Sequence, residues 1–226
     1  HTYKCTSISK NTARKGFHMP FLGLFIAVVC LFTFFRKRSN RSQENVTDRF
    51  WKRESIANNT RLQDLSGLPY ITIPFDKFPI GMYENDLLKN YENTLQTLSG
   101  QKIVNFGTQT NTDLKITYGT ASLPALTEYE QNFTTLCQTL TAYAGQLFEL
   151  GHTDDARTIL EYGISIGSDL SQNYLLLAKI YQSSGETGRI RELLASAEQL
   201  DSLMKRSIVE KLTAMLPEDT ANTPVQ

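Results

Sequence analysis

Few residues in this sequence have the types and spacing that catalysis needs. The stretch GISIG at 163–167 matches the G-x-S-x-G pattern, in which a serine nucleophile lies on a sharp turn between a strand and a helix. Here the stretch falls at the end of a segment with helical periodicity. We therefore interpret Gly163 and Gly167 as small residues for helix packing and turning, and Ser165 as a helix-end hydroxyl.

Acidic and metal-ligating side chains show no catalytic arrangement either. The pairs Glu128/Glu130 and Asp154/Asp155 are typical of solvated helix positions, because no apolar pocket is indicated that would separate their pKa values. The histidines and cysteines are far apart in the sequence and show no ligand spacing. They are His1, His18, His152, Cys5, Cys30 and Cys137. We expect no catalysis, no metal and no cofactor. The alternative is an enzyme whose pocket lies between a predicted β-hairpin at 103–118 and a predicted long helix near 122–150, with Asp113, Tyr118 and Tyr129 as the first candidate residues.

Charge is distributed unevenly along the 226 residues, although the formal net charge is zero. Residues 1–66 hold 12 basic and 4 acidic residues, a net charge of +8, so residues 67–226 carry −8. Nucleic-acid binding needs a cationic surface, which argues against that partner for the acidic part. The basic part also contains the longest apolar run, and positive charge beside such a run is typical of a membrane segment.

The apolar run is Pro20–Phe35, PFLGLFIAVVCLFTFF, and it contains no charged residue. As a helix it would be about 24 Å long, or about 28 Å from Phe17, close to the roughly 30 Å of a hydrocarbon core. We predict a transmembrane helix at 20–35. Within twenty residues, seven Lys and Arg follow the run and four precede it, which favours a cytoplasmic C-terminal domain in a plasma or inner membrane. An extracytoplasmic binding module on a signal anchor is the alternative.

A basic segment follows at 36–66. Arg36, Lys37 and Arg38 are placed to meet anionic headgroups, and Trp51 could lie at the membrane interface or pack on the folded domain. The predicted organisation is a short N-terminal segment, the membrane helix, a basic linker or helix, a small α+β element, a helical domain and a tail. Their ranges are 1–19, 20–35, 36–66, 67–120, 121–216 and 217–226.

The small element is expected to combine one helix with strands. Residues 70–73 are β-prone but bounded by prolines, which predicts a short or edge strand. Leucine spacing predicts a helix near 84–99. The apolar runs 103–106 and 114–118, separated by turn-forming residues, predict a β-hairpin with a longish loop.

Beyond residue 121 the pattern is helical throughout. Steps of three and four between apolar residues predict a long helix near 122–150, which ends at Gly151. Four shorter helices are predicted near 153–167, 169–184, 187–200 and 203–215. The fold class is therefore mainly α.

An internal repeat joins these helices, because several residue types recur after 34 positions. The pairs are Gly151/Gly185, Ala144/Ala178, Leu147/Tyr181, Leu160/Leu194 and Gly163/Ala197. With Tyr174 and Leu177, the second copy resembles the tetratricopeptide repeat, a 34-residue helix–turn–helix unit. It departs from that pattern at Ile190 and Ser202. The whole chain resembles bacterial proteins of no known biochemical activity that combine one N-terminal span with such a domain.

Repeat arrays of this kind present a groove lined by the first helix of each repeat. The resemblance places Thr141, Gly145 and Phe148 from the first copy on that surface, with Leu175, Lys179 and Gln182 from the second. Such side chains suit an extended peptide or a helix. We expect a membrane-anchored scaffold that binds a protein or peptide partner. The alternative is that the groove holds the chain's own segment 44–66.

Overall fold

The computed structural model describes residues 19–216, without the side chains of 19–22 and 37–45. The chain divides into two compact units, one ending at Glu54 and the other beginning at Ser55, and each is considered by itself. The described part is mainly helical and contains no strand, which confirms the predicted mainly α class.

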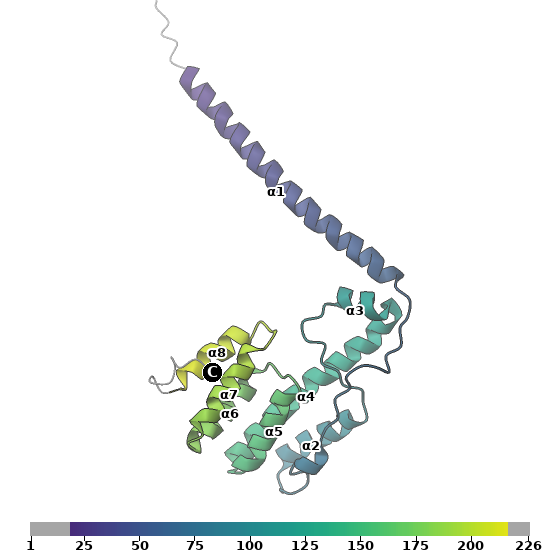
Figure 1. Ribbon diagram of the computed structural model, residues 1–226, viewed down its shortest axis with the longest axis vertical. Helices are drawn as coiled ribbons and strands as arrows, with labels where there is room; N and C mark the ends of the chain where they lie inside the picture. The colour runs from purple at the N-terminus through teal and green to yellow at the C-terminus, as the bar shows by residue number, and fades with distance from the viewer. Residues whose placement is uncertain (1–18, 217–226) are drawn as a thin grey trace, which may run out of the picture. The chain divides into compact units, whose positions relative to one another are not determined.

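Helix α1 spans Met19–Asn59 (Figure 1). Every side chain from Gly23 to Arg36 is exposed, and the segment is apolar up to Phe35. The predicted span at 20–35 begins in residues whose side chains lie outside the description. Across the described residues, no helix combines the length and the apolarity required to cross a bilayer.

The predicted hairpin is wrong. Residues 103–106 are irregular, and helix α3, Asn111–Tyr118, replaces the second strand. The reason is local: the Thr110 side chain accepts a hydrogen bond from the Asp113 N–H, and the Asp113 carboxylate accepts one from the Thr110 N–H. This capping box satisfies two N–H groups that a helix start otherwise leaves unpaired. Leu114 and Tyr118, four residues apart, then lie on one face of the helix: Leu114 is fully buried, and Tyr118 packs against the same apolar cluster.

The rest of the small element is a helix with irregular segments around it. Helix α2, Asp86–Ser99, forms where leucine spacing predicts it, and Asn85 caps its first turn. A short 3-10 turn, η1, covers Phe75–Lys77. The predicted strand at 70–73 is not a strand in the structure. One backbone hydrogen bond, from the Ile71 N–H to the Ile103 carbonyl (2.9 Å), connects it to the 103–106 segment.

A strap, residues 60–66, connects α1 to the small element across a glycine turn. The Gln63 N–H donates to the Tyr118 carbonyl (3.1 Å), and the Thr120 hydroxyl donates to the Ala57 carbonyl (3.0 Å). Gly119 has φ +87°, and a Cβ there would lie 2.6 Å from the Arg61 carbonyl oxygen. Glycine is therefore required at this position both for its backbone conformation and for the close approach of the strap.

Five helices form the remainder of the second unit, close to the predicted ranges. After the 3-10 turn η2 (Thr120–Ser122) come α4 Leu123–Glu149, α5 Thr153–Ser165, α6 Ser171–Ser183, α7 Thr187–Glu198 and α8 Lys205–Ala214. Helix α4 packs on α2 and α5, α5 on α6, and α6 on α7 and α8. The side-by-side order of these helices can be followed in Figure 1.

The 34-residue period reappears in the turns that close α4 and α6. Gly151 and Gly185 both have positive φ, +87° and +72°. The N–H of Gly151 donates to residue 148, and that of Gly185 donates to residue 182; the next N–H in each turn reaches back five residues, to Leu147 and to Tyr181. This pairing is a Schellman motif, which satisfies the last carbonyl groups of a helix. The turns inside the hairpins α4–α5 and α6–α7 are thus equivalent and lie 34 residues apart.

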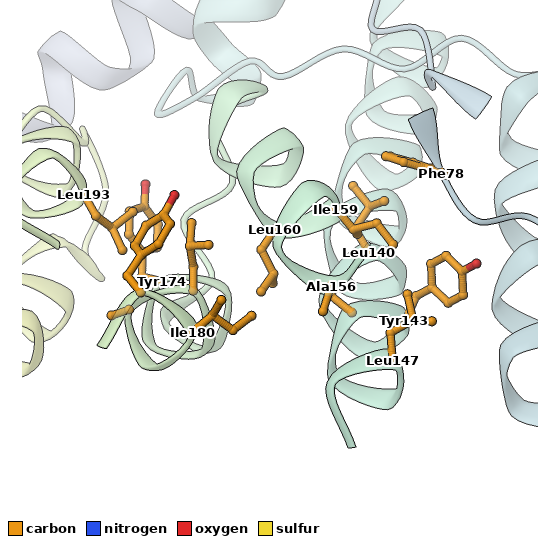
Figure 2. Packing of buried hydrophobic residues seen from close by; sticks show 14 of the residues in the cluster. Phe78, Leu140, Tyr143, Leu147, Ala156, Ile159, Leu160, Tyr174, Ile180 and Leu193 are labelled. Carbon is orange, nitrogen blue, oxygen red and sulfur yellow. The ribbon is translucent and has the colours of Figure 1, made fainter. Parts of the chain in front are cut away.

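Most buried apolar residues of this unit form one cluster shared by α2 and α4–α8. Figure 2 shows Tyr143 and Leu147 of α4 against Ala156 and Ile159 of α5. One polar side chain, Asn173 of α6, is fully buried within this region. Its amide donates to the Leu160 carbonyl (3.2 Å), so it joins α6 to α5 at a point where the neighbouring Gly163 leaves room.

Helix α8 closes the array with one apolar face and one polar face. Ile208 and Leu212, four residues apart, are fully buried against α6 and α7. Arg206 and Glu210 form an exposed ion pair on the outer side (2.8 Å). A polar outer face of this kind is what a terminal helix of a stacked array needs for solubility.

Candidate functional site

An open groove with a volume of about 560 Å³ lies on the second unit, lined by α4, α6 and α8. Its lining comes from the C-terminal end of α4, from the first two-thirds of α6 and from one residue of α8. These residues are Gly145, Phe148, Glu149, Ser171, Gln172, Leu175, Leu176, Lys179 and Lys211. We call this surface the α4–α6–α8 groove.

The apolar part of the groove is half-exposed rather than buried. Phe148, Leu175 and Leu176 pack against the main core but keep part of their surface accessible. The Lys179 Nζ lies 5.2 Å from the centre of the Phe148 ring, within the range of a cation–π interaction. This contact holds the Lys179 ammonium over the groove, where a ligand would meet it.

The polar part of the groove has unused hydrogen-bonding capacity. Neither Lys179 nor Lys211 has a carboxylate partner among the described residues. The Ser171 hydroxyl is buried and has no hydrogen-bond partner among residues 19–216. Ser171 also begins α6, so the positive end of that helix dipole lies at the groove. Glu149 is the one acidic residue of the lining, so the groove favours a ligand that carries negative charge.

The structure brings three of the five predicted partner-binding residues together in this groove: Phe148, Leu175 and Lys179. Thr141 is not among them. Its side chain is buried, and its hydroxyl donates to the Cys137 carbonyl (2.8 Å). Gln182 is exposed beyond the end of the groove, where its amide contacts the Met215 carbonyl (3.5 Å).

Lys211, Ser171 and Leu176 were not predicted from the sequence. The signal for Lys211 was available, because the 34-residue step from Gly145 to Lys179 leads on to Thr213, in the last predicted helix. Following this second step places α8 beside the groove. The alternative was that segment 44–66 fills the groove. Its C-terminal part lies elsewhere, because Ala57 and Gln63 form hydrogen bonds with the turn at 118–120.

The predicted membrane-interface residues belong to the first unit. The side chain of Arg36 is exposed, and those of Lys37 and Arg38 lie outside the description. Trp51 is 62% exposed, with its ring 5.5 Å from that of Phe50 in an edge-to-face arrangement. An apolar, exposed helical segment followed by cations is thus present in the described part of α1.

The residues considered for an enzyme have structural partners. Asp113 belongs to the capping box of α3, and the Tyr118 carbonyl accepts hydrogen bonds from the strap and from Ser122. The Lys102 Nζ lies 5.7 Å from the centre of the Tyr129 ring. The Ser165 hydroxyl donates to the carbonyl of Tyr162, at the end of a helix rather than on a strand–turn–helix elbow.

Neither a reactive thiol nor a metal site is found among the described residues. Burial raises the pKa of the Cys137 thiol to about 11, so this cysteine is not a poised nucleophile. No cluster of three His, Cys, Asp or Glu side chains suited to a metal ion occurs among residues 19–216.

A smaller hollow, about 230 Å³, lies between α5, α6 and α7 and contains an ion-pair network. Glu161 accepts hydrogen bonds from the Tyr181 hydroxyl (2.7 Å), from Arg157 (2.9 Å) and from Arg189 (3.1 Å). Burial raises the pKa of Glu161, but these three donors outweigh burial and lower it below its ordinary value. The network's charges neutralise one another, so it joins three helices and leaves little for a ligand.

Comparison of this chain with protein-family models, with curated proteins and with solved structures found no match.

Proposed function

We propose that this protein is a membrane-attached binding module whose α4–α6–α8 groove holds an acidic peptide segment bearing apolar side chains. The observation that carries the proposal is that one groove combines half-exposed Phe148, Leu175 and Leu176 with two ammonium groups, those of Lys179 and Lys211, that have no carboxylate partner among the described residues. A groove of this kind suits a peptide that offers both carboxylates and aliphatic groups. The module binds its partner without transforming it.

The resemblance to tetratricopeptide repeats supports the same proposal. Equivalent glycine turns join the two helices of the hairpins α4–α5 and α6–α7, and α8 follows at the position of a third first helix. In a stacked array, the first helices line one continuous surface. The groove lies on those helices.

The experiment uses two labelled ten-residue peptides, one alternating Glu and Leu and one alternating Lys and Leu, titrated against the full chain in detergent micelles. We expect the acidic peptide to bind and the basic one not to bind. Reversing both groove charges, Lys179→Glu with Lys211→Glu, should weaken the acidic peptide about tenfold or more, because two favourable charge interactions become repulsive.

A matched control reverses two exposed lysines that lie outside the groove, Lys77→Glu with Lys89→Glu. This variant has the same net charge as the groove variant and should bind the acidic peptide like the wild type. Equal weakening in both variants would show that binding follows net charge alone and would remove the groove from the proposal.

We also propose that the apolar segment Gly23–Phe35 attaches the protein to a lipid bilayer. Its described side chains are exposed all around the helix, which a helix in water avoids and a helix in lipid requires. Arg36 follows the segment directly, where it would meet headgroup phosphates. That the second unit faces the cytoplasm stays a prediction from the flanking charges.

Flotation with phosphatidylcholine vesicles tests this attachment. The change Ile26→Asp with Phe32→Asp places two charges among apolar side chains, where lipid disfavours them, and should abolish flotation. Val46→Asp with Ile56→Asp, two exposed α1 positions outside the segment, should leave it intact. Flotation of both variants would contradict the attachment.

A further inference from the structure

The loop before α2, together with the first residues of that helix, exposes acidic and apolar side chains side by side in the sequence. Met82 is 70% exposed and Leu87 is 52% exposed, although both are apolar. Glu84 and Asp86 lie between them, are exposed and form no ion pair among the described residues. Apolar side chains at the surface with polar groups around them are typical of a contact surface. We call residues 82–87 the acidic loop.

Contacts to α2 and α5 hold the acidic loop in place. The N–H of Gly81, directly before it, donates to the Glu92 carboxylate (3.2 Å). The Tyr83 hydroxyl donates to the Asp155 Oδ2 (2.6 Å), and the Tyr83 ring stacks on that of His152 with 3.7 Å between the ring centres. A loop that is already ordered loses little conformational entropy when it binds. The acidic loop is therefore prepared for contact with a partner.

The acidic loop lies away from the groove of its own chain. Helix α2 packs on α4, whereas α8 packs on α6 and α7, and α5 lies between α8 and α2 in the view of Figure 1. None of residues 82–87 lines the groove. Because Gly81 and Tyr83 fix the loop beside α2 and α5, an acidic loop in the groove has to come from a second copy.

The acidic loop and the α4–α6–α8 groove are complementary in charge and in apolar surface. The groove lining contains Lys179, Lys211 and Glu149, a net charge of +1, beside half-exposed apolar side chains. Neither lysine has a carboxylate partner among residues 19–216. The loop carries a net charge of −2 and two exposed apolar side chains. One of these is Met82, and methionine adapts well to an irregular apolar surface.

From this match we infer that the acidic loop of one copy of the chain binds in the α4–α6–α8 groove of a second copy. The inference rests on the proposed function, because it names an occupant of the same groove. The two surfaces differ, so each pair of copies leaves one groove and one loop unoccupied, and the contact extends head to tail into chains or rings. The groove is small, so association is weak and reversible.

The test is sedimentation equilibrium of the full chain in density-matched micelles, at up to about 0.3 mM protein because small interfaces associate weakly. The wild type should exceed the mass of one chain increasingly with concentration. Glu84→Lys with Asp86→Lys should weaken association about tenfold or more, and so should Lys179→Glu with Lys211→Glu, because attraction becomes repulsion. An equimolar mixture of the two variants should associate again, since each loop then meets a groove of opposite charge.

Matched variants separate this contact from general effects of charge and apolar surface. Glu128→Lys with Glu198→Lys changes the net charge as the loop variant does and should associate like the wild type. Met82→Ser with Leu87→Ser should weaken association, whereas Leu62→Ser with Leu203→Ser, at exposed positions elsewhere, should not.

Three results would overturn the inference. One is a wild type that stays monomeric over the whole concentration range. Another is association that persists in both charge-reversed variants, because α1 or another surface would then join the copies. The third is a mixture of the two variants that stays monomeric, since opposite charges would then fail to restore the contact.

Peptide titration separates this inference from the proposed function. Binding of the Glu–Leu peptide by a chain that stays monomeric would refute the role of the acidic loop alone. Association that the mixture restores, without binding of the Glu–Leu peptide, would refute the proposed peptide ligand alone. Where both hold, excess Glu–Leu peptide should dissociate the assembly, because the two occupants need the same groove.

Discussion

The buried contact between Tyr143 and Glu92 gives a quantitative prediction for the domain's stability. Tyr143 of α4 is fully buried, and its hydroxyl donates to the Glu92 Oε1 of α2 (3.0 Å). Glu92 is 8% exposed, and its other oxygen accepts the Gly81 N–H (3.2 Å). The contact therefore joins α2, α4 and the loop before α2 through one carboxylate.

Replacing Tyr143 by phenylalanine keeps the ring and removes the donor from a buried carboxylate. Hydrogen bonds to charged groups contribute about 1.5–3 kcal/mol, so the Tyr143→Phe change should lower the free energy of unfolding by about 2 kcal/mol. For a domain of 150–250 residues, that corresponds to a decrease in Tm of about 4–8 °C.

The assay is urea unfolding of the full chain in micelles, followed by near-ultraviolet circular dichroism of the tyrosines. Tyr174→Phe is the matched control, because Tyr174 is equally buried but its hydroxyl has no partner within the described residues. In a Glu92→Gln background, the effect of Tyr143→Phe should fall below about 1.5 kcal/mol, because the acceptor is then neutral. Equal losses for Tyr143→Phe and Tyr174→Phe would refute the reasoning.

Three further predictions concern the second unit. Gly119→Ala should lower the free energy of unfolding in urea by about 1–3 kcal/mol and speed proteolysis of the strap, because alanine is strained at φ +87°. Gly67→Ala, at a position in open space, should lower it little. Equal losses in the two variants would contradict the strap contact. Leu160→Ala should lower the free energy of unfolding by about 2–5 kcal/mol, and a loss below 1 kcal/mol would show that this side chain is not packed as described. Burial raises the pKa of Tyr174 and of Tyr181 to about 12, so these groups stay protonated in the folded chain while the unfolded chain ionises from about pH 10. Stability should therefore fall between pH 10 and 12, by up to about 1.4 kcal/mol per pH unit for each tyrosine, and a constant urea midpoint from pH 9 to 11 would contradict this.

The helices could be predicted from the sequence because their apolar residues recur at steps of three and four over long windows. The alternation of Leu114, Ile116 and Tyr118 with polar residues predicts a strand, but the Thr110–Asp113 capping box begins a helix there instead. That signal is local and was readable from the sequence. The packing of the strap on Gly119 was not, because it depends on contacts between distant segments.

The candidate site, too, could be predicted from the sequence only in part. Phe148, Leu175 and Lys179 were predicted together because a 34-residue period places equivalent residues on one surface. Thr141 shares that period, but it faces Asn173 inside the helix stack, and only the packing reveals this. Lys211 was missed because the period was not followed into the last helix.

The equivalent turns at Gly151 and Gly185 make the domain modular. Because the two turns are equivalent, a duplicate of residues 153–186 inserted after Glu186 would follow α6 and precede α7 through turns that the chain already uses. The polar outer face of α8 would still terminate the longer stack. Gene duplication could thus lengthen the binding surface by one hairpin at a time, without redesigning either end.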